Sequence, residues 1–146
     1  MSYMNGMNIS ASGMSAQRLR MDIISQNIAN VNTTRDENGH PYRRQTLVFS
    51  EKTPAPFAGF LNSATGAKSG SGVKVTQIIQ DNETPMKMVY DPSHPDANEE
   101  GYVTYPNVNT VTEMTNLIDA SRSYEANITA FNATKNMALK GLEVGK

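Results

Sequence analysis

The sequence predicts an α+β fold, in which long N- and C-terminal helices form a coiled-coil-like inner layer and a small irregular β region lies between them. Three observations lead to this prediction. Apolar residues recur at helical spacing near both ends of the 146-residue chain, the period changes to that of strands in the middle, and turn residues separate those strands. We expect three parts: an N-terminal helix region at residues 1–34, a β-rich middle at 35–107 and a C-terminal helix region at 108–146.

The first predicted helix extends from about Met7 to Val31. Apolar residues lie seven positions apart at Met14, Met21 and Ile28, and others fill the three-and-four pattern between and after them, although Gln17 interrupts it; this spacing places them along one face. This narrow stripe comprises Met14, Met21, Ile24, Ile28 and Val31. Asparagine is a poor helix former because its short amide competes with the backbone for hydrogen bonds. Asn27, Asn30 and Asn32 therefore indicate a helix end of low intrinsic stability.

The middle of the chain has the pattern of short strands. The predicted strands are residues 42–49, 73–79, 87–90 and 102–105. They are rich in β-branched and aromatic residues, and Asn-Gly, Asp-Pro and Pro-rich turn signals separate them. Residues 63–72 are rich in Gly and Ser, and we expect them to form a flexible loop.

The second predicted helix begins at Thr110, which together with Glu113 matches the capping-box pattern of a hydroxyl followed three residues later by a glutamate. Gly141 is expected to be its C-cap. Between these ends, a seam alternates by three and four residues as in a coiled coil. The seam comprises Met114, Leu117, Ser121, Tyr124, Ile128, Phe131, Lys135 and Ala138. Roughly 30 residues at 1.5 Å each give a rod of about 45 Å.

Both apolar stripes are too narrow for the helices of a globular core, and the sequence between them offers little core to cover. Helices of this kind are held mainly by packing against other elements. We therefore expect the two stripes to meet each other or copies of themselves in other subunits. On this interpretation the residues of both stripes, Lys135 excepted, form an assembly interface.

Composition restricts the remaining function classes. Only 38% of residues are hydrophobic, the mean hydropathy is −0.50, and the net charge is −1, so no general attraction to nucleic acid or an anionic membrane is expected. The absence of cysteine excludes disulfides, thiolate metal sites and a cysteine nucleophile. The N-terminus lacks the pattern of a cleaved signal peptide, and no stretch approaches the roughly 18 apolar residues that span a bilayer. We therefore expect no direct membrane insertion.

Motifs of catalysis and ligand binding are also weak. The two histidines, His40 and His94, each precede a proline in a predicted turn, and no G-x-S-x-G element is present. The acidic turn at residues 91–100 lacks the ligand spacing of a calcium loop, and the glycine-rich residues 66–74 do not match a phosphate-binding loop. Residues 35–44 combine arginines with a tyrosine, but acidic residues dilute the charge. We expect no enzyme activity, cofactor, metal or nucleic acid.

Several motifs resemble one known family. The segment "SASGMSAQRLRMDIISQNIANVNTT" (residues 10–34) resembles the N-terminal motif of the flagellar rod and hook axial proteins. The segment "PNVNTVTEMTNLIDASRSYEANITAFNATKNMALKGLE" (residues 106–143) is similar to their C-terminal helix. Between them, "NGHPYRRQTLVF", "GVKVTQI" and "YDPSHPDANEEGYVTYPNVN" resemble the proximal-rod members of the family in particular.

The resemblance implies a structural role without catalysis. Members of this family are exported unfolded by the flagellar type III apparatus, without a cleaved signal peptide, and stack into a helical tube that crosses the periplasm in the flagellar basal body. The implied partners are copies of the chain itself, other rod proteins, the basal-body base and the export apparatus.

The resemblance also assigns roles to single residues. Ala29, Asn30, Asn32 and Thr33 match the family's "AN-x-N-T" element, where the first helix ends. Asn27, Asn30 and Asn32 would then fix the register of packed helices at some cost in stability, as polar residues do in coiled coils. Phe57 and Leu61, in "FAGFL", have the spacing implied for contact with the export gate, although a short apolar loop anchor explains them equally well.

The residues alone leave two alternative functions open: an unrecognised enzyme, which would have a defined pocket around His40 or His94, and a helical-hairpin adaptor. A cytoplasmic helical-hairpin adaptor would pair its two stripes within one chain and bind a partner through its β region. The rod interpretation predicts terminal helices that are labile in the free chain, whereas the adaptor interpretation predicts a stable monomer.

Overall fold

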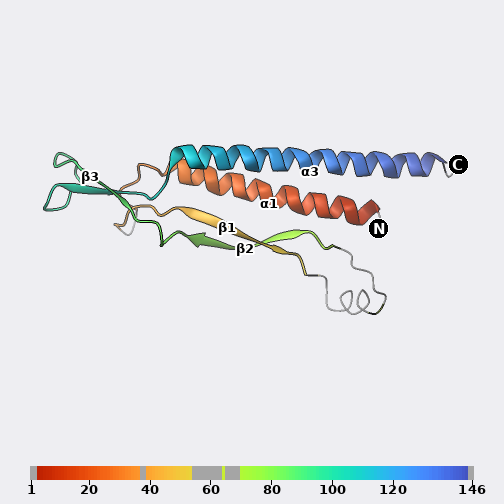
Figure 1. Ribbon diagram of the computed structural model, residues 1–146, viewed down its shortest axis with the longest axis horizontal. Coiled ribbons are helices and arrows are strands. Elements are labelled where there is room, and N and C mark those ends of the chain that lie inside the picture. Colours follow the sequence, from red (N-terminus) through yellow and green to blue (C-terminus); the bar gives the residue numbers. More distant parts are fainter. Residues whose placement is uncertain (1–2, 37–38, 54–63, 65–69, 145–146) are drawn as a thin grey trace. The chain divides into compact units, whose positions relative to one another are not determined.

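The computed structural model describes residues 3–36, 39–53, 64 and 70–144. Two long helices enclose four short strands in the sequence, which confirms the predicted α+β fold (Figure 1). In chain order the elements are α1 (Tyr3–Ala29), β1 (Gln45–Glu51), β2 (Val73–Gln80), β3 (Lys87–Tyr90), β4 (Tyr102–Tyr105) and α3 (Thr110–Val144). Phe57, Leu61 and most of the predicted loop at 63–72 lie outside the described residues, and the division into three parts remains a prediction.

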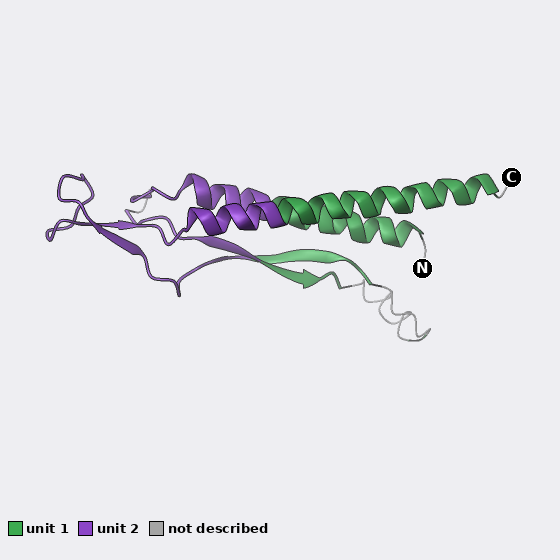
Figure 2. Ribbon diagram, turned by 45° about the horizontal axis from the view of Figure 1, so that its top comes forward, with its two compact units in different colours: residues 1–19, 48–77, 120–146 green, residues 20–47, 78–119 purple. Residues whose placement is uncertain are grey.

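The chain forms two compact units, which are coloured separately in Figure 2. The first unit contains residues 1–19, 48–77 and 120–146, and the second contains residues 20–47 and 78–119. In each unit a segment of α1 lies alongside a segment of α3. Each unit therefore contains its own portion of the helix pair, which shows that α1 and α3 pair within one chain.

The strands form two antiparallel pairs, β1 with β2 and β3 with β4. In the second pair Lys87 lies opposite Tyr105 and Tyr90 lies opposite Tyr102. The bounds of β3 and β4 are those predicted, and β2 extends one residue further than predicted. Strand β1 begins at Gln45 instead of residue 42, because the amide of Arg44 donates to the Asn107 side chain.

Both predicted ends of the C-terminal helix need correction. Asn109, and not Thr110, is the N-cap: its Oδ1 accepts from the amides of Val111 at 3.0 Å and Thr112 at 3.3 Å. Asn is preferred over Thr at this position. At the other end, α3 continues to Val144, so that Gly141 lies inside the helix and is not its C-cap.

The packed face of α3 also differs from the predicted seam. Positions 117, 124, 131 and 138 of the seam are half-buried, but Met114 and Lys135 are exposed. Four further covered residues each lie one position before every second residue of the seam, at Glu113, Ala120, Asn127 and Thr134. These residues are polar or small. The predicted seam therefore included two exposed positions and omitted these four contact residues.

Contacts in the first unit show that the helices run antiparallel and approach closely. Gly13 lies against Asn127, and Gly6 lies against Thr134. A Cβ atom added to Gly13 would be 2.8 Å from the Asn127 Oδ1 atom, closer than ordinary packing allows. Glycine at this position therefore permits the two helix backbones to come together.

Candidate functional site

A buried polar cluster in the second unit is the candidate functional site. Its centre is Asn27 of α1, whose side chain has no exposed surface. The Asn27 Nδ2 atom donates to the Gln45 carbonyl at 2.8 Å and to Glu113 Oε2 at 3.1 Å. Its Oδ1 atom accepts from the Tyr42 hydroxyl and from the Gln45 amide, each at 2.9 Å. One amide thus connects α1, the start of β1 and α3.

Glu113 supplies the negative charge of the cluster. It was predicted to cap α3, but its side chain is only 1% exposed and its carboxylate accepts hydrogen bonds from Asn27 and Arg44. Its Oε1 atom accepts from Arg44 Nε at 2.9 Å and lies 2.8 Å from Arg44 Nη2. This two-point contact neutralises a carboxylate that would otherwise be costly to bury.

Asn107 and Asp81 extend the cluster toward β2. Asn107 Oδ1 accepts from the Arg44 amide at 2.9 Å, and its Nδ2 atom donates to the carbonyls of Asp81 and Thr84. Asp81 also lies 3.8 Å from Arg44 Nη1. Hydrogen bonds from Thr84 lower the pKa of Asp81, and the charge of Arg44 adds to this effect. The carboxylate therefore remains ionised beside the guanidinium.

The environment of Tyr42 keeps its phenol neutral beside the ionised Glu113. Burial raises the pKa of its phenol, and the negative charge of Glu113 raises it further. The hydroxyl therefore stays protonated and donates to Asn27. The arrangement satisfies charges and hydrogen bonds between elements that are distant in the sequence, which suits a structural junction.

The residues predicted for the N-terminal helix fall into different environments. Ile24 is buried, whereas the other stripe residues are half-buried. Those residues are Met14, Met21, Ile28 and Val31. Asn30 makes only local bonds, from its Nδ2 atom to the Gln26 carbonyl at 2.9 Å and from the Thr33 hydroxyl to its Oδ1 atom at 3.1 Å. Asn32 is exposed. Of the three asparagines, Asn27 alone is shown bonding to α3.

The residues predicted for the C-terminal helix are also divided between half-buried and exposed positions. Leu117, Ser121, Tyr124, Ile128, Phe131 and Ala138 are half-buried. Met114 is 53% exposed and belongs to a different face, together with Val111 at 73% and Ile118 at 54%. We call Val111, Met114 and Ile118 the α3 apolar row, because their spacing places them on one side of the helix. Sequence reasoning assigned Met114 to the packed seam and did not identify this row.

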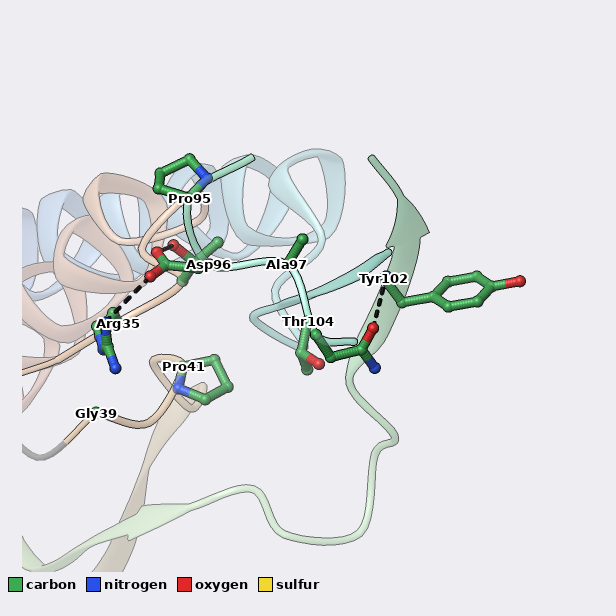
Figure 3. A pocket seen from close by; sticks show the side chains of 10 residues that line it. Arg35, Gly39, Pro41, Pro95, Asp96, Ala97, Tyr102 and Thr104 are labelled. Atoms are coloured by element: carbon green, nitrogen blue, oxygen red, sulfur yellow. Dashed lines mark hydrogen bonds and ion pairs between the residues drawn. The ribbon is translucent and has the colours of Figure 1, made fainter. Parts of the chain in front are cut away.

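In the second unit, the segment between α1 and β1, the loop between β3 and β4, and β4 itself line a polar hollow of about 290 Å³ (Figure 3). Arg35 and Asp96 face each other across it with a 3.5 Å ion pair, and the Thr34 hydroxyl donates to Asp96 at 2.8 Å. His94 Nδ1 accepts from the Asp96 amide at 3.1 Å. In the described part of the chain, no group of three His, Asp or Glu side chains is arranged to hold a metal. Similarly, no described helix combines the length and apolar character needed to cross a membrane.

Comparisons with known proteins agree over the whole chain. A family model described as "Flagella basal body rod protein" matches residues 7–35, and one described as "Flagellar basal body rod FlgEFG protein C-terminal" matches residues 99–144. Three relatives share the name "Flagellar basal-body rod protein FlgC". That of Bacillus subtilis (strain 168) is 47% identical with 100% of both chains covered. That of Borreliella burgdorferi is 43% identical with 99% of this chain and 98% of the relative covered. That of Salmonella typhimurium is 38% identical with 100% of both chains covered.

Proposed function

Because the chain belongs to the FlgC family of flagellar basal-body rod proteins, we propose that it is a structural subunit of the proximal rod, without catalytic activity. In this proposal the flagellar type III apparatus exports the chain without a cleaved signal peptide. The exported chain then assembles with copies of itself, with other rod proteins and with the basal-body base. Similarity over the full length supports the proposal, since both helical ends and the β region have counterparts in the relatives.

The structural observation that carries the proposal is the α3 apolar row. Val111, Met114 and Ile118 are more than half exposed, although apolar side chains of this size are usually covered. The opposite side of α3 already packs within the chain, through Glu113 in one unit and Asn127 in the other. The row is therefore available for a neighbouring subunit. We propose that it forms part of the assembly interface, together with the stripe residues identified in the sequence other than Ile24, which is buried within the chain.

The test is a charged substitution in the row. We expect Met114→Asp combined with Ile118→Asp to leave the helix content of the purified chain unchanged, because neither side chain is buried. A carboxylate placed in a subunit interface loses its hydration, so we expect the variant to be exported but absent from purified basal bodies. Motility on soft agar should fall accordingly. Immunoblots of the secreted and basal-body fractions separate export from assembly.

Thr112→Asp is the matched control, because Thr112 is an exposed polar residue of the same helix and the substitution adds the same kind of charge. At about 100° of rotation per residue, Thr112 lies on a different side of α3 from Met114 and Ile118. We expect this variant to support normal motility. Incorporation of the double variant at the level of the control would exclude the row from the interface.

A further inference from the structure

The contact between α1 and α3 repeats after seven residues. In the first unit, Gly13 lies against Asn127 and Gly6 lies against Thr134. Gly6 and Gly13 are seven residues apart, and so are Asn127 and Thr134. Seven residues correspond to about two helical turns, or roughly 10 Å of travel along the axis. If α1 moved by this distance, Gly6 would meet Asn127, and the close approach of a glycine to the Asn127 side chain would be preserved.

In the second unit, a displacement of seven residues would change which side chain of α1 faces Glu113. Asn27 bonds to Glu113, and Arg20 lies seven residues before Asn27. The same displacement would therefore place Arg20 opposite Glu113. A guanidinium beside a carboxylate is favourable, so charge does not oppose the displaced register. Neither the close contact of a glycine with Asn127 nor the charge of Glu113 therefore distinguishes the two registers.

The amide of Asn27 does distinguish them. It donates to Glu113 and the Gln45 carbonyl, and it accepts from the Tyr42 hydroxyl and the Gln45 amide. Arginine has donors but no acceptor. In the displaced register Tyr42 and the Gln45 amide would lose their common acceptor in a buried site, which is unfavourable.

We propose that Asn27 is the positioning residue that selects the observed register of α1 against α3 over a register displaced by seven residues. Asn30 makes only local hydrogen bonds and does not share this role. The inference concerns the free chain and does not depend on the proposed rod function. If the register is selected in this way, Asn27 also determines which side chains of α1 and α3 lie next to each other on the surface offered to a neighbouring subunit.

The absence of native cysteine permits a direct test with engineered disulfides in the purified full chain. Gly6→Cys with Thr134→Cys reports the observed register, because a Cβ atom at Gly6 lies 3.4 Å from the Thr134 Cγ2 atom. Gly6→Cys with Asn127→Cys reports the displaced register. In the observed register these two positions are seven residues out of step, which is too far for a disulfide. Mass spectrometry of non-reduced digests measures the yield of each pair.

With Asn27 intact, we expect only the pair at Gly6 and Thr134 to form. Adding Asn27→Leu should raise the yield of the pair at Gly6 and Asn127 at least tenfold and lower that of the other pair. Adding Arg20→Glu as well should abolish this increase, because two carboxylates would face each other in the displaced register. Asn30→Leu is the matched control and should leave both yields unchanged.

Two results would overturn the proposal. In the first, Asn27→Leu retains the wild-type yields of both pairs. In the second, the yield of the pair at Gly6 and Asn127 rises but does not respond to Arg20→Glu, as expected if the variant only unfolds. Neither result bears on the rod function, which basal-body incorporation tests separately.

Discussion

At the scale of single residues, the buried polar cluster could be predicted only in part. Asn27 was identified because an asparagine is unexpected in an apolar helix stripe. Its hydrogen-bond partners come from other segments of the chain: Tyr42 and Gln45 follow the first helix, whereas Glu113 lies 86 residues after Asn27. Tyr42 and Arg44 were noted only as part of a basic and aromatic segment. Local patterns do not reveal which distant side chain will neutralise a given charge. The members of the cluster could therefore be identified only from the structure.

The ion pair between Arg44 and Glu113 gives a prediction at this scale. Arg44→Leu leaves an almost fully buried carboxylate without its cation. Removing one partner of a buried pair is strongly destabilising, and we expect the free energy of unfolding to fall by about 3 kcal/mol. Urea denaturation followed by circular dichroism measures the change. Because leucine can replace both partners without burying a charge, Arg44→Leu with Glu113→Leu should recover most of the loss.

Arg35 provides the matched control for this experiment. Its ion pair with Asp96 spans 3.5 Å, but the Arg35 side chain is 67% exposed. Exposed pairs contribute little, so Arg35→Leu should change the free energy of unfolding by less than about 1 kcal/mol. Equal losses from Arg35→Leu and Arg44→Leu would show that burial of Glu113 does not set the strength of the interaction.

At the scale of secondary-structure elements, the sequence predicted the elements well and their packing less well. Strands β3 and β4 have the predicted bounds because turn residues mark their ends clearly. The predicted seam of α3 omitted Asn127 and Thr134, because a search for apolar residues passes over polar residues at contact positions. Small and polar residues form this contact because Gly13 and Gly6 bring the opposite backbone close.

The glycines of the two helices give a prediction at the scale of elements. Alanine is the better helix former by about 1 kcal/mol, but a Cβ atom at Gly13 would clash with Asn127. The Asn127 amide is held by a 2.8 Å hydrogen bond from its Nδ2 atom to the Ser123 carbonyl and cannot move without losing it. We therefore expect Gly13→Ala to lower the free energy of unfolding by about 1–3 kcal/mol, as overpacked sites do. Thermal denaturation with circular dichroism detection is the measurement.

Gly141 is the control, since a Cβ atom placed there would have no described atom within 4 Å apart from its chain neighbours and the adjacent helix backbone. Gly141→Ala should raise the free energy of unfolding by up to about 1 kcal/mol through helix propensity. Asn127→Ala combined with Gly13→Ala should remove the clash and restore stability. If Gly13→Ala stabilised the chain as much as Gly141→Ala, the close approach of the helices would have no energetic importance.

At the scale of the whole molecule, the chain buries few apolar side chains and exposes many. The buried ones among the described residues are Ala16, Ile23, Ile24, Val103 and Ala120. By contrast, Leu142 and Val144 near the end of α3 are 72% and 88% exposed. Because packing supplies most of the stability of a helix, the end of α3 is poorly supported in the free chain. The polar cluster, in contrast, fixes the start of α3 through Glu113.

This contrast predicts how the free chain is cleaved by trypsin, which cuts after lysine and arginine. We expect cleavage after Lys135 and Lys140, both exposed on α3, to be at least about tenfold faster than cleavage after the hydrogen-bonded Arg44, because local opening is easiest where contacts are few. Timed digestion with mass spectrometry gives the three rates. In purified basal bodies the two lysines should become resistant, since neighbouring subunits would then support the helix. If Lys135 and Lys140 were as resistant as Arg44 in the free chain, α3 would be stable without partners, as the adaptor interpretation requires.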